Sequence, residues 1–178
     1  MNTLKLFITH YTAHFAAWSV RLLLATTLAL PQLASAALVV NTDATVTDTI
    51  TGLMWDQCAN GQSTVSTPCD TGGLNTLTWS AALATATAAN TANYKGYSDW
   101  RVPNIKELES LSDRSRAAYP LIDTSIFNVG NGTINFWSST SSAANPNVAW
   151  TMYPIYAFAS EGQLKINATS AVRLVRGG

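Results

Sequence analysis

The sequence places a carboxylate beside a guanidinium in the segment Asp99-Trp100-Arg101. In an active site, such a pair can orient a substrate or shift the pKa of the carboxylate. The segment reads as a turn just before a helix, where a charged pair can instead tie the turn to a neighbouring sheet. We favour this structural interpretation, and we expect Arg173 or Arg176 of the last strand to be a buried partner of Asp99.

The residues that follow predict how this helix begins. Pro103 precedes Asn104, and Glu107 stands three positions later, which is the spacing of an N-cap residue with an acidic N3 partner. Ile105 and Leu108 then recur at helical spacing. We therefore predict a short helix from residue 105 and give the whole block from Asp99 to Glu107 a structural role.

Tryptophans and asparagines near residue 145 could bind a sugar. Trp137 and Trp150 flank the loop Asn145-Pro146-Asn147, and we expect these two rings nearer the surface than the other tryptophans after residue 50. The loop resembles the polar loops with which lectins hold calcium, but a calcium site needs carboxylates, and residues 141–147 contain none. The expectation is a hairpin turn without a metal, beside a candidate ligand surface.

Arg114 and Arg116, with Lys106 nearby, form the main basic concentration. Gathered on one surface, they could bind an anionic polymer through charge-assisted hydrogen bonds. Asp113 and Glu109 lie close in sequence, so a mixed, solvated face is the alternative that we favour.

Cys58 and Cys69 are separated by a polar, loop-like segment. In an exported chain they would form a local disulfide that closes the loop. A redox-active or metal-binding pair is the alternative, which the absence of C-x-x-C spacing disfavours.

Catalytic and cofactor chemistry is disfavoured by composition. Both histidines, His10 and His14, precede residue 37, so the rest of the chain lacks the side chain needed for Ser-His-Asp or Cys-His catalysis. Carboxylate pairs of the kind used by glycosidases sit in no recognisable motif. We expect no enzyme activity, no cofactor and no metal.

Residues 1–36 have the pattern of a secretory signal peptide. Lys5 and Arg21 precede an apolar run over residues 22–30, and Ala34-Ser35-Ala36 provides a small-residue cleavage site. The alternative is an uncleaved anchor. Cleavage would release residues 37–178 as a single domain to the periplasm, the cell surface or the medium, with membrane contact only during export.

Charge and composition of the predicted mature domain limit its partners. Residues 37–178 lose two of the ten basic residues and none of the ten acids, which leaves a formal charge of −2. Nucleic acid is therefore not an expected partner. The oligomeric state is not predicted.

The periodicity of the mature region predicts strands, then two helices, then strands. A hairpin is expected over 45–55 and a helix over 79–90 with Thr78 as its N-cap. Strands are expected from 136, within 148–158, and over 171–176, with a turn at 160–162. This order indicates an α+β domain.

Six segments in this order carry a family pattern: TVTDTITGLMW, a helix opening at Trp79, GYSDWRVPNIKELESL, FWSST, Ala149-Trp150 and VRLVRGG. The pattern, over residues 44–178, resembles the C-terminal domain of the Legionella collagen-like adhesins. The resemblance implies a relative of the C-type lectin-like fold that formylglycine-generating enzymes share, with two helices on antiparallel sheets and neighbouring termini. It also implies binding to sulfated polysaccharide. The chain departs from the family where Ala89 or its neighbours and Leu174 replace a cysteine pair, and it lacks the late cysteines of the enzymes.

Together these observations predict an exported, non-catalytic adhesion domain that recognises a surface polysaccharide or a protein partner. One alternative is a structural envelope protein that only assembles with itself or with other proteins. The other is a small carboxylate-dependent hydrolase. Exposed aromatic or arginine side chains around one concavity would favour binding, whereas a broad apolar patch would favour assembly.

Overall fold

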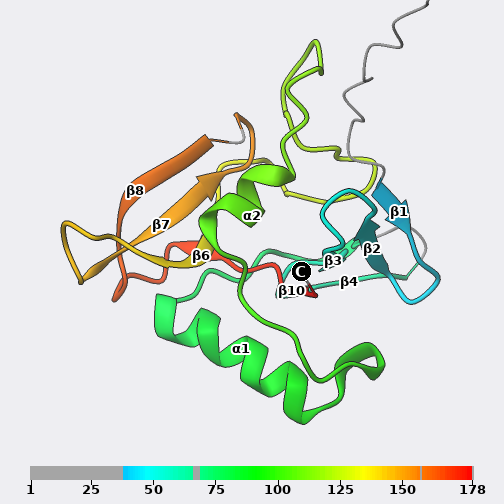
Figure 1. The fold of residues 1–178 in the computed structure, drawn as a ribbon, viewed down its shortest axis with the longest axis horizontal. Helices are drawn as coiled ribbons and strands as arrows, with labels where there is room; N and C mark the ends of the chain where they lie inside the picture. Colours follow the sequence, from blue (N-terminus) through cyan, green and yellow to red (C-terminus); the bar gives the residue numbers. More distant parts are fainter. Residues whose placement is uncertain (1–37, 66–68, 157, 178) are drawn as a thin grey trace, which may run out of the picture. The chain divides into compact units, whose positions relative to one another are not determined.

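The computed structural model describes residues 38–65, 69–156 and 158–177 (Figure 1). The predicted signal peptide, residues 1–36, lies outside these residues. Among the residues described, no helix has both the length and the apolar character required to cross a membrane. The elements combine two α-helices with several small sheets, which confirms the predicted α+β class.

One four-stranded sheet joins the two ends of the domain. Its strands, in spatial order, are β1 (Leu38–Val40), β2 (Thr45–Asp48), β3 (Met54–Asp56) and β10 (Val175–Arg176). All three neighbouring pairs are antiparallel. The β2–β3 hairpin confirms the prediction for 45–55, and Gly52 in its turn has a φ of 72°, a conformation that glycine adopts without strain.

A second four-stranded sheet lies on the other side of the core. Its spatial order is β8 (Phe158–Leu164), β7 (Val148–Tyr153), β6 (Asn135–Ser141) and β9 (Ser170–Ala171). The β6–β9 pair is parallel and the others are antiparallel. A small sheet of β4 (Gln62–Ser63) and β5 (Thr71–Gly72) completes the strands.

Two sequence predictions about these strands were wrong. The turn expected at residues 160–162 lies inside β8, whose pairing with β7 runs from Phe158 to Leu164. The single strand expected over 171–176 is divided between β9 and β10, which belong to different sheets. The chain crosses from one sheet to the other at residues 172–174, which periodicity alone cannot indicate because both ends alternate in the same way.

The helices begin where capping residues predict. Helix α1 (Trp79–Thr91) starts after Thr78, whose hydroxyl accepts a hydrogen bond from the Ala81 N–H. A 3₁₀ turn, η1 (Tyr94–Gly96), follows. Helix α2 (Ile105–Ser110) starts after Asn104, with the predicted capping box complete.

The core consists of two apolar clusters that share strand β6. Phe136 belongs to the cluster around α2, and its neighbour Trp137 belongs to the cluster under α1. Successive side chains of a strand point to opposite faces, so one strand can supply both clusters. The C-terminal segment alternates likewise, because Ala171 and Val175 join the α2 cluster, whereas Val172 and Leu174 join the α1 cluster.

Arg173 lies inside this alternation and is 2% exposed. Its guanidinium donates to the carbonyl oxygens of Asp56 (2.9 Å), Gln57 and Asn128 (3.0 Å). It also lies 4.9 Å from the ring centroid of Phe127. Burial lowers the pKa of Arg173 to about 10, against the opposing effect of the Asp56 carboxylate, so the side chain stays charged at neutral pH. One buried cation thus connects the end of β3, the loop at 126–129 and the C-terminal segment.

Replacement of Arg173 should lower the free energy of unfolding more than replacement of an exposed arginine does. Arg173→Met leaves three carbonyl groups without their donor and should lower the free energy of unfolding by about 3 kcal/mol. Arg114→Met, at an exposed position, should change it by less than about 0.5 kcal/mol. Urea denaturation of both variants provides the comparison. Equal stability of the two variants would show that the Arg173 hydrogen bonds contribute little.

Candidate functional site

The segment Asp99-Trp100-Arg101 connects the first sheet to α2. The backbone N–H of Arg101 donates to the Val175 carbonyl at 2.8 Å, and the Val175 N–H donates back at 2.9 Å. Trp100 is 2% exposed, and its indole N–H donates to the Tyr94 carbonyl at 3.0 Å. These contacts hold the turn against β10, as the structural interpretation predicts.

Asp99 and Arg101 bind different partners. The Asp99 carboxylate accepts from Arg176 Nε at 2.6 Å, and this hydrogen bond holds the pKa of Asp99 below its usual range. Arg101 forms two hydrogen bonds of 2.7 Å with the Glu107 carboxylate. Arg176 is therefore the partner expected for Asp99, but the ion pair is solvent-accessible rather than buried, with Asp99 54% exposed.

The capping box explains the remaining residues of this block. The Asn104 side chain accepts from the Glu107 N–H at 3.0 Å, and the Glu107 carboxylate accepts from the Asn104 N–H at 2.7 Å. The Pro103 carbonyl accepts from the Ser139 N–H of β6 at 2.8 Å. The charged and capping side chains of the block, Asp99, Arg101, Asn104 and Glu107, thus have structural partners within the domain.

Trp137 does not form part of a binding surface, which corrects the sequence expectation. The side chain is fully buried, and its indole N–H donates to the Leu77 carbonyl at 2.8 Å. It faces α1 because Phe136, its neighbour in β6, faces the α2 cluster. Trp150 is half-buried and packs against the α2 cluster, so it offers only part of its ring to solvent.

The loop with Asn145 and Asn147 is the predicted hairpin turn. The Asn147 N–H donates to the Asn145 side chain at 3.0 Å, and the Val148 N–H donates to the Asn145 carbonyl at 3.0 Å. Lys165 Nζ fixes the loop from β8's side through the Pro146 carbonyl, at 2.8 Å. Within 38–65, 69–156 and 158–177, no group of three or more His, Cys, Asp or Glu side chains could hold a metal ion.

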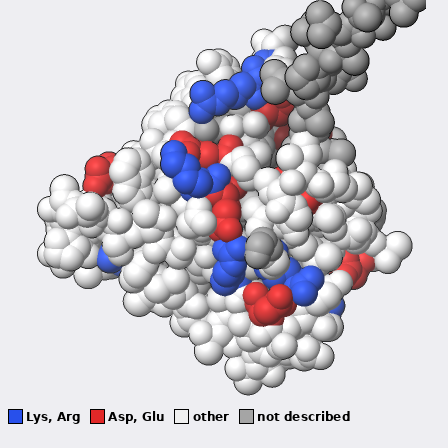
Figure 2. Space-filling model, in the orientation of Figure 1, with Lys and Arg blue, Asp and Glu red and all other residues white. Residues whose placement is uncertain are grey.

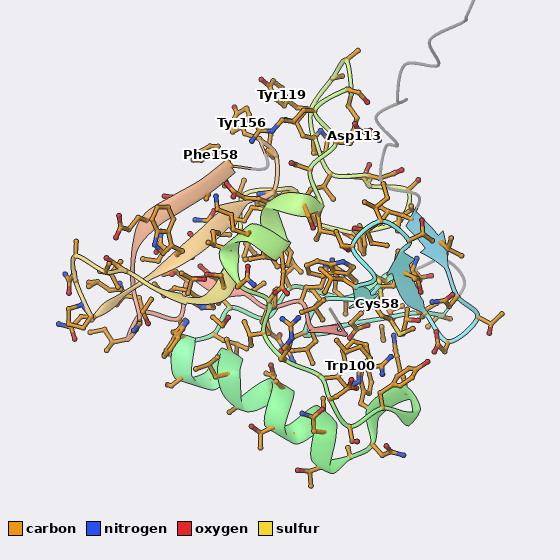
Figure 3. The ribbon with its side chains drawn as sticks, viewed as in Figure 1. Cys58, Trp100, Asp113, Tyr119, Tyr156 and Phe158 are labelled. Atoms are coloured by element: carbon orange, nitrogen blue, oxygen red, sulfur yellow. A yellow bond between two sulfur atoms is a disulfide. The ribbon has the colours of Figure 1, made fainter. Side chains whose placement is uncertain are left out.

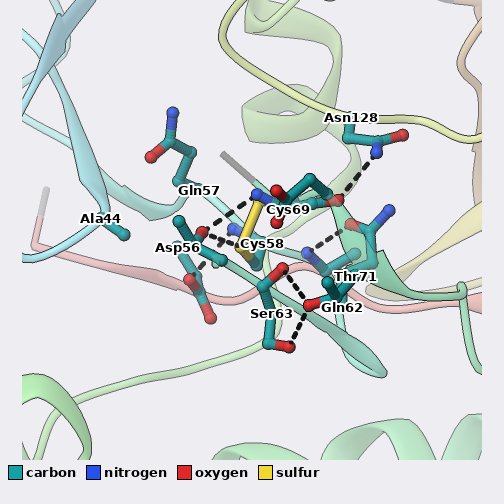
Figure 4. The surroundings of a disulfide bond; sticks show 12 residues. Ala44, Asp56, Gln57, Cys58, Gln62, Ser63, Cys69, Thr71 and Asn128 are labelled. Atoms are coloured by element: carbon teal, nitrogen blue, oxygen red, sulfur yellow. Dashed lines mark hydrogen bonds between the residues drawn. A yellow bond between two sulfur atoms is a disulfide. The ribbon is translucent and has the colours of Figure 1, made fainter. Parts of the chain in front are cut away.

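The predicted disulfide between Cys58 and Cys69 is present, with the two Cα atoms 5.1 Å apart (Figure 4). Around it, Asn128 Nδ2 donates to the Cys69 carbonyl at 2.8 Å. The disulfide closes the loop after β3, and the Asn128 hydrogen bond joins this loop to the same 126–129 segment that Arg173 binds.

Arg114 and Arg116 lie in a loop that projects between α2 and β6. The loop is closed at its base by the Asp113 N–H, which donates to the Leu121 carbonyl at 2.8 Å. Arg116 Nε donates to the Pro120 carbonyl at 3.2 Å, and its guanidinium lies 3.8 Å from Asp123. Both arginines line an open hollow of about 280 Å³ with Tyr119.

Tyr119 of this loop lies near Tyr156 and Phe158 (Figure 3). Tyr119 meets Tyr156 edge to face with ring centroids 4.8 Å apart, and Tyr156 stacks near Phe158 at 6.1 Å. Tyr153 contacts both Tyr156 and Phe158. Tyr119, Tyr156 and Phe158 are 64%, 46% and 47% exposed. We call this surface the aromatic–arginine patch, comprising Arg114, Arg116, Tyr119, Tyr153, Tyr156 and Phe158.

Sequence reasoning missed the aromatic half of the patch. Residues 148–158 are largely apolar and aromatic with Pro154 inside, which predicts two strands or one bulged edge strand. The structure ends β7 at Tyr153 and begins β8 at Phe158. One signal was available: Tyr119-Pro120 and Tyr153-Pro154 both place a tyrosine before a proline, which favours a strand end or a turn. The Leu121 N–H joins the two turns through the Ile155 carbonyl at 2.9 Å.

The structure thus divides the predicted ligand residues between two places. Asn145 and Asn147 precede the start of β7, whereas Tyr153, which belongs to the patch, lies at its end. Six residues of strand span about 17 Å. The arginines therefore gather with unforeseen tyrosines and not with the asparagine loop.

These features define a class: a disulfide-bonded α+β domain with an exposed aromatic surface carried on loops and strand ends. The family model described as the Lcl C-terminal domain matches residues 44–176, well over half of the chain. The chain therefore belongs to this family, the C-terminal domain of the Legionella collagen-like proteins, as its sequence pattern indicates. A comparison with curated proteins finds no significant match.

The Arg101–Glu107 pair should make stability depend on pH. Partial burial of Glu107 opposes ionisation, but hydrogen bonds from Arg101 and the Asn104 N–H outweigh it and lower the pKa of Glu107. Its contribution is therefore present above the unfolded pKa of about 4.3 and is lost as the pH falls through the lower folded value. Glu107→Gln should cost about 1 kcal/mol at neutral pH. The difference from wild type should shrink as the pH falls below about 4.3 and vanish once the pH is below the lowered folded pKa.

Glu109→Gln is the matched control on the same helix, because Glu109 pairs with Lys106, which is 84% exposed. This variant should change stability by a few tenths of a kcal/mol at most. Urea titrations across the pH range measure both variants. A pH-independent cost for Glu107→Gln would contradict the ion-pair explanation.

Proposed function

We propose that this chain is an exported, non-catalytic adhesion domain that binds a surface polysaccharide through the aromatic–arginine patch. The observation that carries the proposal is the exposure of three aromatic rings, two in loops and one at the start of β8, beside two arginines. Monomeric proteins rarely leave such rings clustered on their surface unless the cluster binds something.

The chemistry of the patch suits a sugar polymer. Aromatic rings provide flat, rigid apolar faces, and pyranose rings present C–H faces that pack on them. Tyrosine hydroxyls and arginine N–H groups add hydrogen bonds to sugar hydroxyl, carboxylate or sulfate groups. The hollow of about 280 Å³ beside Tyr119 gives this surface a concave wall.

The charge pattern favours stacking over a purely electrostatic mode of binding. Asp123 lies 3.8 Å from Arg116 and partly neutralises it. In Figure 2, basic and acidic side chains adjoin each other across the face shown, with no broad area of one sign. We therefore propose that the rings supply most of the affinity and the arginines the preference for anionic groups.

Three further features support the rest of the proposal. The family is named for the C-terminal domain of a collagen-like adhesin. The predicted signal peptide and the Cys58–Cys69 disulfide agree with export. We also propose a distant relation to the C-type lectin-like fold, supported by β1 and β10, which bring both ends of the domain into one sheet.

Self-assembly is a second candidate, favoured by one observation. Strand β1 is an edge strand, and its residues Val39 and Val40 are each 47% exposed. An apolar edge strand can pair with another chain. In this case the domain would be a structural envelope component.

A glycan array with the purified, disulfide-bonded protein tests the proposed function, with sulfated and neutral polymers and a series of salt concentrations. Tyr156→Ala should weaken polysaccharide binding about tenfold, because it removes the ring that contacts the other three. Arg114→Met should weaken binding to sulfated polymers more than to neutral ones and should reduce the salt dependence.

Ile166→Ala is the matched control, because Ile166 is 80% exposed and lies outside the patch. It should leave binding unchanged. Binding that survives Tyr156→Ala, or a cooperatively folded protein that binds no glycan, would overturn the proposal. If the folded protein binds no glycan, concentration-dependent association measured by sedimentation would instead support the self-assembly function.

A further inference from the structure

A second concavity lies on α1, apart from the aromatic–arginine patch. It has a volume of about 240 Å³ and is lined by the C-terminal half of the helix and the segment that follows β3. We call it the α1 pocket. Its lining consists of Asp56, Ala59, Asn60, Gly61, Gln62, Thr85, Ala89, Ala92, Tyr94 and Leu174.

Small side chains on one helix face keep this pocket open. Thr85 and Ala89 lie four residues apart on one face of α1, and the C-cap residue Ala92 follows three residues later on the same side. One turn earlier, Ala82 and Ala86 are buried against the core and seal the contact. Beyond Ala86, the small side chains of α1 do not contact the residues on the opposite wall. The space between them is the α1 pocket.

The wall opposite the helix is polar and ordered. The Asp56 side chain accepts from Lys95 Nζ at 2.8 Å and from the Cys58 N–H at 3.2 Å, and the residue is 6% exposed. The Tyr94 hydroxyl adjoins this carboxylate, and burial together with the Asp56 charge raises the pKa of Tyr94. The hydroxyl therefore stays protonated. Its hydrogen is engaged by the Asp56 carboxylate, and its oxygen can accept a hydrogen bond from a ligand.

Two side-chain amides have hydrogen-bonding capacity to spare. Asn60 and Gln62 use their amide oxygens to accept from Asn75 Nδ2 and from the Ala59 N–H. Among the residues that the structure describes, their amide nitrogens have no hydrogen-bond partner. Lys95 already neutralises Asp56, so the pocket carries no excess charge that would select an ion.

We propose that the α1 pocket binds a single neutral sugar ring, independently of the aromatic–arginine patch. Its volume equals the liquid volume of about eight water molecules, which suits one monosaccharide unit. Free amide donors and a tyrosine hydroxyl match sugar hydroxyls, while Tyr94's ring, Ala89 and Leu174 match the apolar face of the ring. The pocket would therefore hold a chain end or a free sugar.

NMR titration of the purified, disulfide-bonded protein with the methyl glycosides of glucose, galactose and N-acetylglucosamine tests this proposal. At millimolar concentration, at least one glycoside should shift the amide signals of Gly61, Thr85 and Ala89 in a saturable manner. Tyr94→Phe removes only a hydroxyl and should weaken this binding about tenfold. Ala89→Phe fills the pocket and should abolish it.

Ala88→Phe is the matched control, because Ala88 is exposed on the same helix and does not line the pocket. It should leave the titration unchanged. No saturable shift with any of the three glycosides would overturn the proposal, as would shifts that persist in Ala89→Phe. Tyr156→Ala should not affect the titration, so failure here is distinguishable from failure of polysaccharide binding at the patch.

Discussion

The fold depends on a charged group held inside an apolar core. A guanidinium removed from water is costly unless each donor finds an acceptor, and Arg173 finds them in backbone carbonyls rather than in a carboxylate. These carbonyls belong to the end of β3 and to the 126–129 loop, and the disulfide segment contacts this loop through Asn128. The 126–129 loop and the disulfide segment have little regular structure. Hydrogen bonds from Arg173 and Asn128, in place of strand pairing, therefore fix them at the centre of the domain.

This arrangement separates the parts that hold the fold from the parts that face solvent. Asp99, Arg101 and Glu107 are occupied in tying α2 to β10, and Asn145 and Asn147 are occupied in their own turn. The tyrosines at 119 and 156 contact mainly one another and leave much of their surface exposed. Side chains with partners inside the domain have little left to offer a ligand, which is why the most motif-like block is not the candidate site.

Features of the fold that depend on residues close together in the chain could be predicted from the sequence. The N-caps at Thr78 and Asn104, the 45–55 hairpin and the Cys58–Cys69 bridge each depend on residues close in the chain. The full burial of Trp137 and the patch were not predictable in this way. They depend on which sheet face α1 covers and on the meeting of turns 119–121 and 153–156, contacts that no local periodicity encodes.

The most direct test of the central claim is to locate a bound polysaccharide on the wild-type protein. The tightest-binding polymer from the array would be added to isotope-labelled, disulfide-bonded protein, and the perturbed NMR signals assigned. Polysaccharide bound at the aromatic–arginine patch should perturb the ring protons of Tyr119, Tyr156 and Phe158 while the signals of Asn145 and Asn147 stay in place. Perturbed signals confined to the asparagine loop and Trp150 would contradict this assignment. They would place the binding site at the start of β7.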